Sequence, residues 1–149
     1  MKSAAENLTP ITLELGGKSP AIIHDDAPID DVAARIIYGK FFNGGQTCIA
    51  PDHIIVNEQK IPELLKALEK YAKKMYGEKN SMTSAIDDQQ LHRWNFLLAD
   101  AIAKGAIPHP LTNSDIHEFT PTVLTNIPIN SLVLSEEIFG PILPIISTS

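Results

Sequence analysis

The chain alternates between short apolar runs and longer segments in which apolar residues recur with the period of a helix. Apolar runs stand at 21–23, 54–56, 123–124 and 142–146. After the first run, apolar residues at 29, 32, 33, 36 and 37 predict an amphipathic helix that ends at Gly44–Gly45. Because strands that alternate with helices pack as layers, we predict an α/β domain with a largely parallel sheet flanked by helices.

Two more helices are expected in the middle of the chain. The first begins at Pro62 and ends before Gly77, with a stripe at Ile61, Leu64, Leu65, Leu68, Tyr71, Ala72 and Met75. The second runs from about Asp87 to Lys104, and Gly105 ends it. Its stripe contains Leu91, Trp94, Leu98, Ala101 and Ile102. Near the start of the chain, the alternation in Ile11–Leu15 predicts a strand that runs into the Gly16–Gly17 turn.

Composition excludes several classes of protein. The 149 residues carry a net charge of −6, so we expect no nucleic-acid partner. The apolar runs are far shorter than the ~20 residues of a membrane helix, and no apolar signal core follows Met1. A single cysteine, Cys48, excludes an internal disulfide and a cysteine-based zinc cluster. We therefore expect one soluble cytoplasmic domain.

The turn Gly16–Ser19 imitates a phosphate-binding loop. A true loop needs a further glycine where this chain has Thr12, and it must open a helix, whereas Pro20 disfavours helical angles at Ser19. We therefore reject a nucleotide triphosphatase function for this turn. What remains is a carboxylate, Glu14, at the end of the predicted strand, where sites of α/β sheets tend to lie. An exposed edge glutamate is the alternative.

Cys48 follows two consecutive glycines and two polar residues, Gln46 and Thr47. Such a loop allows close approach to the sulfur, and its amide groups can stabilise a thiolate or an oxyanion. An inert buried thiol is an equal alternative on this evidence. A Cys-His hydrolase would need His24 or His53 to approach through the fold.

Two other groups of residues have to be weighed. The segment Glu136–Pro141 joins two carboxylates, an aromatic ring and a Gly-Pro turn, and read alone it favours a plain connection from a helix to a strand over a functional site. The histidines lack the spacing of metal ligands, and the adjacent pair His117–Glu118 would face opposite ways on a strand. We expect no metal site.

Together, three segments resemble the aldehyde dehydrogenase superfamily, most like its coniferyl-aldehyde and class 3 fatty-aldehyde branches. Leu13–Pro20 resembles the family's glutamate signature, Phe41–Asp52 its cysteine signature, and Glu136–Pro141 its third block. The spacing of 48 − 14 = 34 residues between Glu14 and Cys48 also resembles that of the family.

The resemblance implies roles for six residues. Cys48 would be the nucleophile that forms a thiohemiacetal and then a thioester, and Glu14 the general base that activates water. Cofactor-binding residues would be Glu137 on the nicotinamide ribose, Phe139 beside the nicotinamide, and Leu15 and Gly16 at the turn. The cofactor would be NAD or NADP, the substrate a small-molecule aldehyde, and the assembly a homo-oligomer.

The family's dinucleotide-binding domain and its C-terminal oligomerisation segment have no counterpart in residues 1–149. We therefore expect the chain to be part of an aldehyde dehydrogenase catalytic domain that does not turn over alone. The alternative is a catalytically inert folding or interaction module. Its exposed faces should favour self-association.

Overall fold

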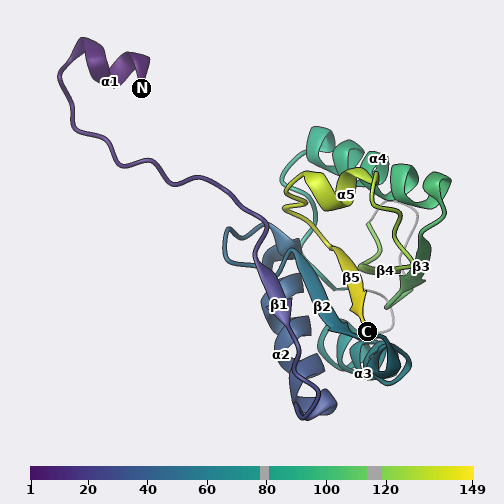
Figure 1. Cartoon of the computed structure of the whole chain (residues 1–149). Coiled ribbons are helices and arrows are strands. Elements are labelled where there is room, and N and C mark those ends of the chain that lie inside the picture. The colour runs from purple at the N-terminus through teal and green to yellow at the C-terminus, as the bar shows by residue number, and fades with distance from the viewer. Residues whose placement is uncertain (78–80, 114–118) are drawn as a thin grey trace.

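The computed structural model describes residues 1–77, 81–113 and 119–149, and the strands in these residues form one five-stranded sheet (Figure 1). Two short 3₁₀ turns, η1 and η2, accompany the helices. In chain order the elements are α1 (Lys2–Glu6), β1 (Pro20–Ile22), α2 (Ile29–Phe41), η1 (Phe42–Gly45), β2 (His53–Asn57), η2 (Glu58–Lys60), α3 (Ile61–Tyr76), α4 (Asp88–Lys104), β3 (Ile107–Pro110), β4 (Thr122–Thr125), α5 (Leu132–Ser135) and β5 (Ile142–Thr148).

The sheet is largely parallel, which confirms the predicted fold class. Its strand order is β1-β2-β5-β4-β3, so the last strand of the chain lies in the centre. β2 pairs in parallel with β1 and with β5, and β5 pairs in parallel with β4. Only β3 is antiparallel, against β4.

Helices cover both faces of the sheet, and each face has its own core. Successive residues of a strand point to opposite faces, so Val123 and Leu124 of β4 enter different cores. Val123 packs in the core under α2 and α3, with Ile54 of β2. Leu124 packs in the core under α4 and α5, with Trp94. Figure 1 shows the two helix pairs on either side of the strands.

The three long helices were predicted within a few residues, because their ends carry recognisable signals. Asp87 caps α4, since its Oδ1 accepts a hydrogen bond of 2.7 Å from the backbone N–H of Gln90. Gly105 ends the same helix in a left-handed conformation with φ of 113°. Two residues of the expected stripes do not enter the core: Met75 and Ile102 are each 43% exposed.

β3 was not predicted, because its sequence Ile107–Pro110 contains two prolines. Proline cannot donate a ladder hydrogen bond, so within sheets it is found on edge strands. β3 occupies an edge of this sheet, paired only with β4 among the described residues. The edge position therefore explains how both prolines are accommodated.

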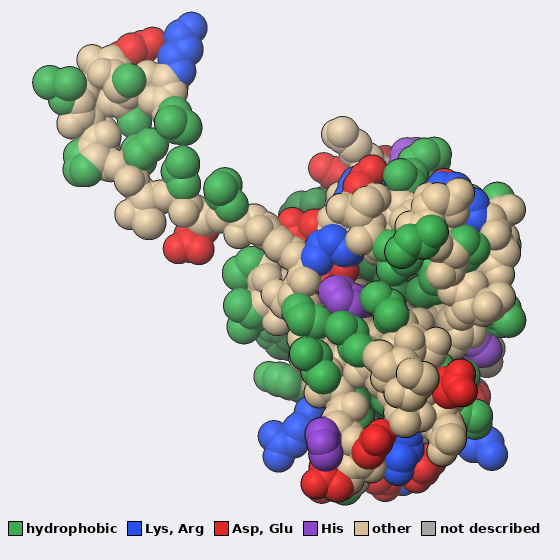
Figure 2. Space-filling view, in the orientation of Figure 1, with side chains coloured by type: hydrophobic (Ala, Val, Ile, Leu, Met, Phe, Trp, Pro, Cys, Tyr) green, Lys and Arg blue, Asp and Glu red, His purple; other side chains and the backbone are tan. Residues whose placement is uncertain are grey.

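The predicted strand at Ile11–Leu15 is wrong. Residues 7–19 form no helix or strand, and the segment runs away from the body of the molecule (Figure 1). A strand needs a partner for its backbone groups, and no described strand pairs with this segment. Leu13 and Leu15 are 55% and 80% exposed, and apolar side chains gather along the extension (Figure 2).

None of the helices in the described ranges is long and apolar enough to cross a membrane.

Candidate active site

Cys48 follows a loop whose backbone only glycine accommodates well. After α2, the chain passes through η1, where Gly44 and Gly45 adopt φ angles of 65° and 75°. A Cβ on Gly45 would lie 2.4 Å from the carbonyl oxygen of Gly140, so the two segments are in close contact. Cys48 itself is a free, exposed cysteine. This exposure agrees with the interpretation of Cys48 as a reactive thiol. It disagrees with the alternative that Cys48 is an inert buried thiol.

Gln46 fastens this loop to the segment before α4. Its Nε2 donates to the carbonyl oxygens of Asn43 and Ser84, both at 3.1 Å, and its Oε1 accepts from the N–H of Ile86 at 2.9 Å. All three partners are backbone groups. The sequence indicated only that Gln46 is polar, because its partners at 84 and 86 lie almost forty positions away.

Two predicted cofactor-binding residues lie against each other. The carboxylate of Glu137 packs on the backbone of Gly16, where an added Cβ would lie 1.8 Å from Oε2 of Glu137. Any larger residue at position 16 would therefore displace this carboxylate. The contact brings together two segments that are about 120 residues apart, and the absence of a Cβ at Gly16 is the reason they can approach.

Phe139 is held in a strained backbone conformation. Its φ is 45°, which is uncommon for a residue with a side chain, and the side chain remains 39% exposed. Its carbonyl oxygen accepts hydrogen bonds from Nε2 of Gln90 at 2.9 Å and Nε1 of Trp94 at 3.1 Å. α4 thus supplies the donors that keep the Phe139 loop in place.

Glu14 and Leu15 directly precede Gly16 along the chain. Both are exposed in the extended segment, and the Glu14 side chain makes no hydrogen bond or ion pair with another described residue. The prediction that Glu14 lies at a strand end is wrong, because the strand does not form. The structure brings Gly16 against Glu137, whereas the Glu14 side chain is exposed.

The two histidines considered as partners of Cys48 bind elsewhere. Nδ1 of His24 lies 2.6 Å from Asp26, and Nδ1 of His53 lies 3.4 Å from Asp52. In residues 1–77, 81–113 and 119–149, no side chain forms a hydrogen bond with the Cys48 sulfur. A Cys-His hydrolase therefore has no support in this geometry.

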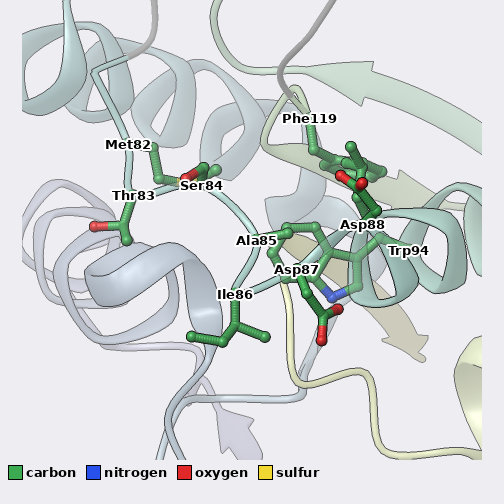
Figure 3. A pocket seen from close by; sticks show the side chains of 10 residues that line it. Met82, Thr83, Ser84, Ala85, Ile86, Asp87, Asp88, Trp94 and Phe119 are labelled. Carbon is green, nitrogen blue, oxygen red and sulfur yellow. The ribbon is translucent and has the colours of Figure 1, made fainter.

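Two cavities adjoin the segment between α3 and α4. One, of about 300 Å³, lies over Trp94 and Phe119, whose rings meet edge to face at 5.6 Å (Figure 3). The other, of about 500 Å³, is lined by Asn43, Gln46, Thr83, Ser84, Ala85, Ile86 and Phe139. This second cavity lies between the cysteine loop and the Phe139 loop, and residues of both loops line it.

A buried charge lies under the cysteine loop. Lys40, near the end of α2, is fully buried, and burial lowers the pKa of its ammonium group to about 8. This pKa also includes two smaller effects, because the carboxylate of Asp52 raises it and the ammonium of Lys18 lowers it. Lys18, rather than Lys40, forms the ion pair with Asp52.

Among the residues that the structure describes, no group of three or more His, Cys, Asp or Glu side chains could hold a metal ion. The pair His117–Glu118 lies outside the described residues.

Comparison with known proteins extends over the whole chain. The family model "Aldehyde dehydrogenase family" matches residues 1–149. A probable coniferyl aldehyde dehydrogenase of Pseudomonas aeruginosa is 43% identical over 98% of this chain and 32% of its own length. The chain therefore spans about a third of the length of this curated relative.

Solved structures agree with the sequence comparison. The substrate-bound AldH of Staphylococcus aureus has a TM-score of 0.84 and 38% identity, over 99% of this chain and 33% of its own. An NADP-dependent glyceraldehyde-3-phosphate dehydrogenase of Bacillus halodurans, solved with NADP, has a TM-score of 0.83 and 29% identity, over 99% of this chain and 32% of its own. With its fold, its motifs and its full length matched, the chain belongs to the aldehyde dehydrogenase family.

Proposed function

We propose that this chain supplies the catalytic cysteine and the nicotinamide-facing loop of an enzyme that oxidises an aldehyde to a carboxylic acid. The observation that carries the proposal is the exposed thiol of Cys48 on a glycine loop that packs against Gly140, next to the Glu137–Phe139 segment. The family match over residues 1–149 supports it.

The residues fit the nicotinamide half of NAD or NADP. Glu137 offers a carboxylate that can accept hydrogen bonds from ribose hydroxyls, and Phe139 offers a partly exposed ring beside a cavity of about 500 Å³. The structure solved with NADP among the relatives supports the same class of cofactor. When bound, the nicotinamide would supply the hydride acceptor.

In the proposed reaction, the Cys48 thiolate adds to the aldehyde carbon, and the carbonyl oxygen becomes an oxyanion held in part by the Cys48 N–H. Loss of hydride from that carbon leaves a thioester on the sulfur. Glu14 then takes a proton from water, whose oxygen attacks the thioester, and the acid leaves as the thiol re-forms. In the structure the Glu14 side chain is exposed, within residues 7–19, which form no helix or strand.

The exposed position of Glu14 favours a second candidate for the isolated chain, namely an inert folding module. We therefore expect no hydride transfer from the 149 residues alone with an aldehyde and NAD or NADP. Cys48 should still react with a mild alkylating agent, as mass spectrometry of the folded chain would show. Robust turnover by the isolated chain would contradict the inert-module hypothesis.

An exchange experiment tests the catalytic roles. The 149 residues would replace the matching third of the Pseudomonas aeruginosa relative, and formation of reduced nicotinamide would be followed by absorbance. We expect turnover of coniferyl aldehyde in the chimera and none after Cys48→Ser. Glu14→Gln should give one burst of reduced nicotinamide and a thioester visible by mass spectrometry. Unchanged activity after Cys48→Ser would overturn the proposal.

The proposed function extends to the partners and the location of the protein. The aldehyde substrate defines a small-molecule partner, and homo-oligomers would cover the apolar side chains that β1 and the preceding segment expose. A cytoplasmic location is consistent with one unpaired cysteine, and cell fractionation would test it.

A further inference from the structure

Lys18 uses every proton of its ammonium group in contacts with other segments. Nζ donates to Oδ1 of Asp52, to the carbonyl oxygen of Val133 at 2.9 Å and to that of Glu136 at 2.8 Å. An ammonium group has three donors, so this one is saturated. The side chain is 22% exposed, and Asp52 is 4% exposed.

Asp52 uses both of its carboxylate oxygens. While Oδ1 accepts from Lys18, Oδ2 accepts from the backbone N–H of Ile138 at 3.0 Å. The backbone N–H of Asp52 donates to the carbonyl oxygen of Ser19 at 2.8 Å. One buried carboxylate thus joins the residues after Cys48 to Lys18, in the segment after Gly16, and to the loop that contains Glu137.

These contacts hold Glu137 from both sides along the chain. Lys18 binds the carbonyl of the preceding residue, Glu136, and Asp52 binds the amide of the following residue, Ile138. Lys18 is also only two residues beyond Gly16, against which the Glu137 carboxylate packs. The ion pair therefore connects the two sides of the Gly16–Glu137 contact.

We propose that Lys18 and Asp52 are positioning residues, whose partly buried ion pair sets the place of the Glu137 carboxylate against Gly16. The proposal rests on the proposed function for its importance, since the cofactor ribose would bind this carboxylate. The placement itself is a property of the chain and can be measured without a cofactor.

The test uses the amide resonance of Gly16 in ¹⁵N-labelled chain. Because the carboxylate lies against this backbone, Glu137→Gln should shift the Gly16 resonance. We expect the shift to disappear in Lys18→Met and in Asp52→Asn, and to persist in Lys18→Arg, which keeps the positive charge and the donors. Dispersed spectra and the fluorescence of Trp94, the only tryptophan, identify variants that remain folded.

Lys104→Met is the matched control. Lys104 also binds one aspartate, Asp100, and one backbone carbonyl, that of Asn130, both at 2.7 Å, but it lies outside the Glu137 loop. The Gly16 response, meaning the shift of the Gly16 amide resonance that Glu137→Gln causes, should persist in this variant. If Lys18→Met does not fold, Asp52→Asn provides the test. In Asp52→Asn, the rate of hydrogen exchange at the Ile138 amide should rise more than the rate at the Leu132 amide.

A Gly16 response that persists unchanged in folded Lys18→Met or Asp52→Asn would overturn the proposal, as would its loss in Lys104→Met. Titration of each variant with nicotinamide mononucleotide separates the two proposals. Loss of the Gly16 response without nucleotide binding in the wild type would support the positioning role and count against the cofactor assignment.

Discussion

Gly45 shows how a single missing Cβ shapes the site. Its φ of 75° and the carbonyl oxygen of Gly140, which an added Cβ would meet at 2.4 Å, both exclude larger residues. The sequence identified the glycine pair as important for access to Cys48. It could not show that the second glycine is pressed against Gly140, because the contact crosses 95 positions and depends on the finished sheet.

Gly45→Ala is expected to lower the free energy of unfolding by about 1–3 kcal/mol or more, through backbone strain and the clash with Gly140. Urea denaturation measures it. Gly17→Ala is the control, because nothing lies within 4 Å of an added Cβ there. Equal losses in the two variants would contradict the argument.

Lys40 should make the free energy of unfolding depend on pH in the alkaline range. Its pKa is about 8 in the folded chain and 10.5 as a free side chain, so the unfolded state binds more protons between these values. The free energy of unfolding should therefore rise with pH across that window, by at most about 3 kcal/mol. This contribution is lost as the pH falls through 8.

Lys40→Met removes the titrating group and leaves Asp52 paired with Lys18. Denaturation at about pH 7 and about pH 10 should show a smaller rise for the variant than for the wild type. The variant should also be at least as stable at neutral pH, since a buried charge is costly. Parallel pH curves for the two proteins would refute this prediction.

At the scale of the elements, α4 was predictable because its signals are local. Asp87, the apolar stripe and Gly105 all lie within one helix length. The strand at Ile11–Leu15 had a comparable local pattern, yet a strand forms only where another strand offers hydrogen bonds. Local pattern was therefore sufficient for α4 and for the strands at the four apolar runs, but it was misleading at Ile11–Leu15, and the two prolines hid β3.

Asp87→Ala is expected to reduce the free energy of unfolding by about 1 kcal/mol, because the N–H of Gln90 loses its acceptor. Amides in the first turn of α4 should also exchange faster. Asp88→Ala, in the same turn without the capping bond, should have a smaller effect. Equal free energies of unfolding for Asp87→Ala and Asp88→Ala would show that the Asp87 cap does not stabilise α4.

For the site as a whole, the sequence indicated the motifs but not the contacts between them. Glu137 and Gly16 were both expected near the cofactor, and their contact is now described. The sequence does not indicate the Lys18–Asp52 pair, because its two members are 34 residues apart and meet only in the folded chain. The other acceptors of Lys18, at 133 and 136, are 115 and 118 residues away.

Exposed apolar side chains at one end of the sheet should make the whole molecule self-associate. Ile22 is 75% exposed on β1, an edge strand whose outer side pairs with no described strand. Light scattering at rising concentration should show growing mass, and Ile22→Lys should reduce it. Ile129→Lys, at a site 91% exposed outside any strand, is the control. A monomer at high concentration would rule this out.

The position of β5 has a consequence for the order of folding. β5 is the last strand along the chain, yet it lies between β2 and β4, which have no direct pairing with each other. During synthesis, β1 and β2 with α2 and α3 can assemble early, and β3 and β4 with α4 later, as two half-sheets. Only the insertion of β5 unites them. Because Glu136–Gly140 immediately precedes β5, the Glu137 loop reaches its place in that same late step.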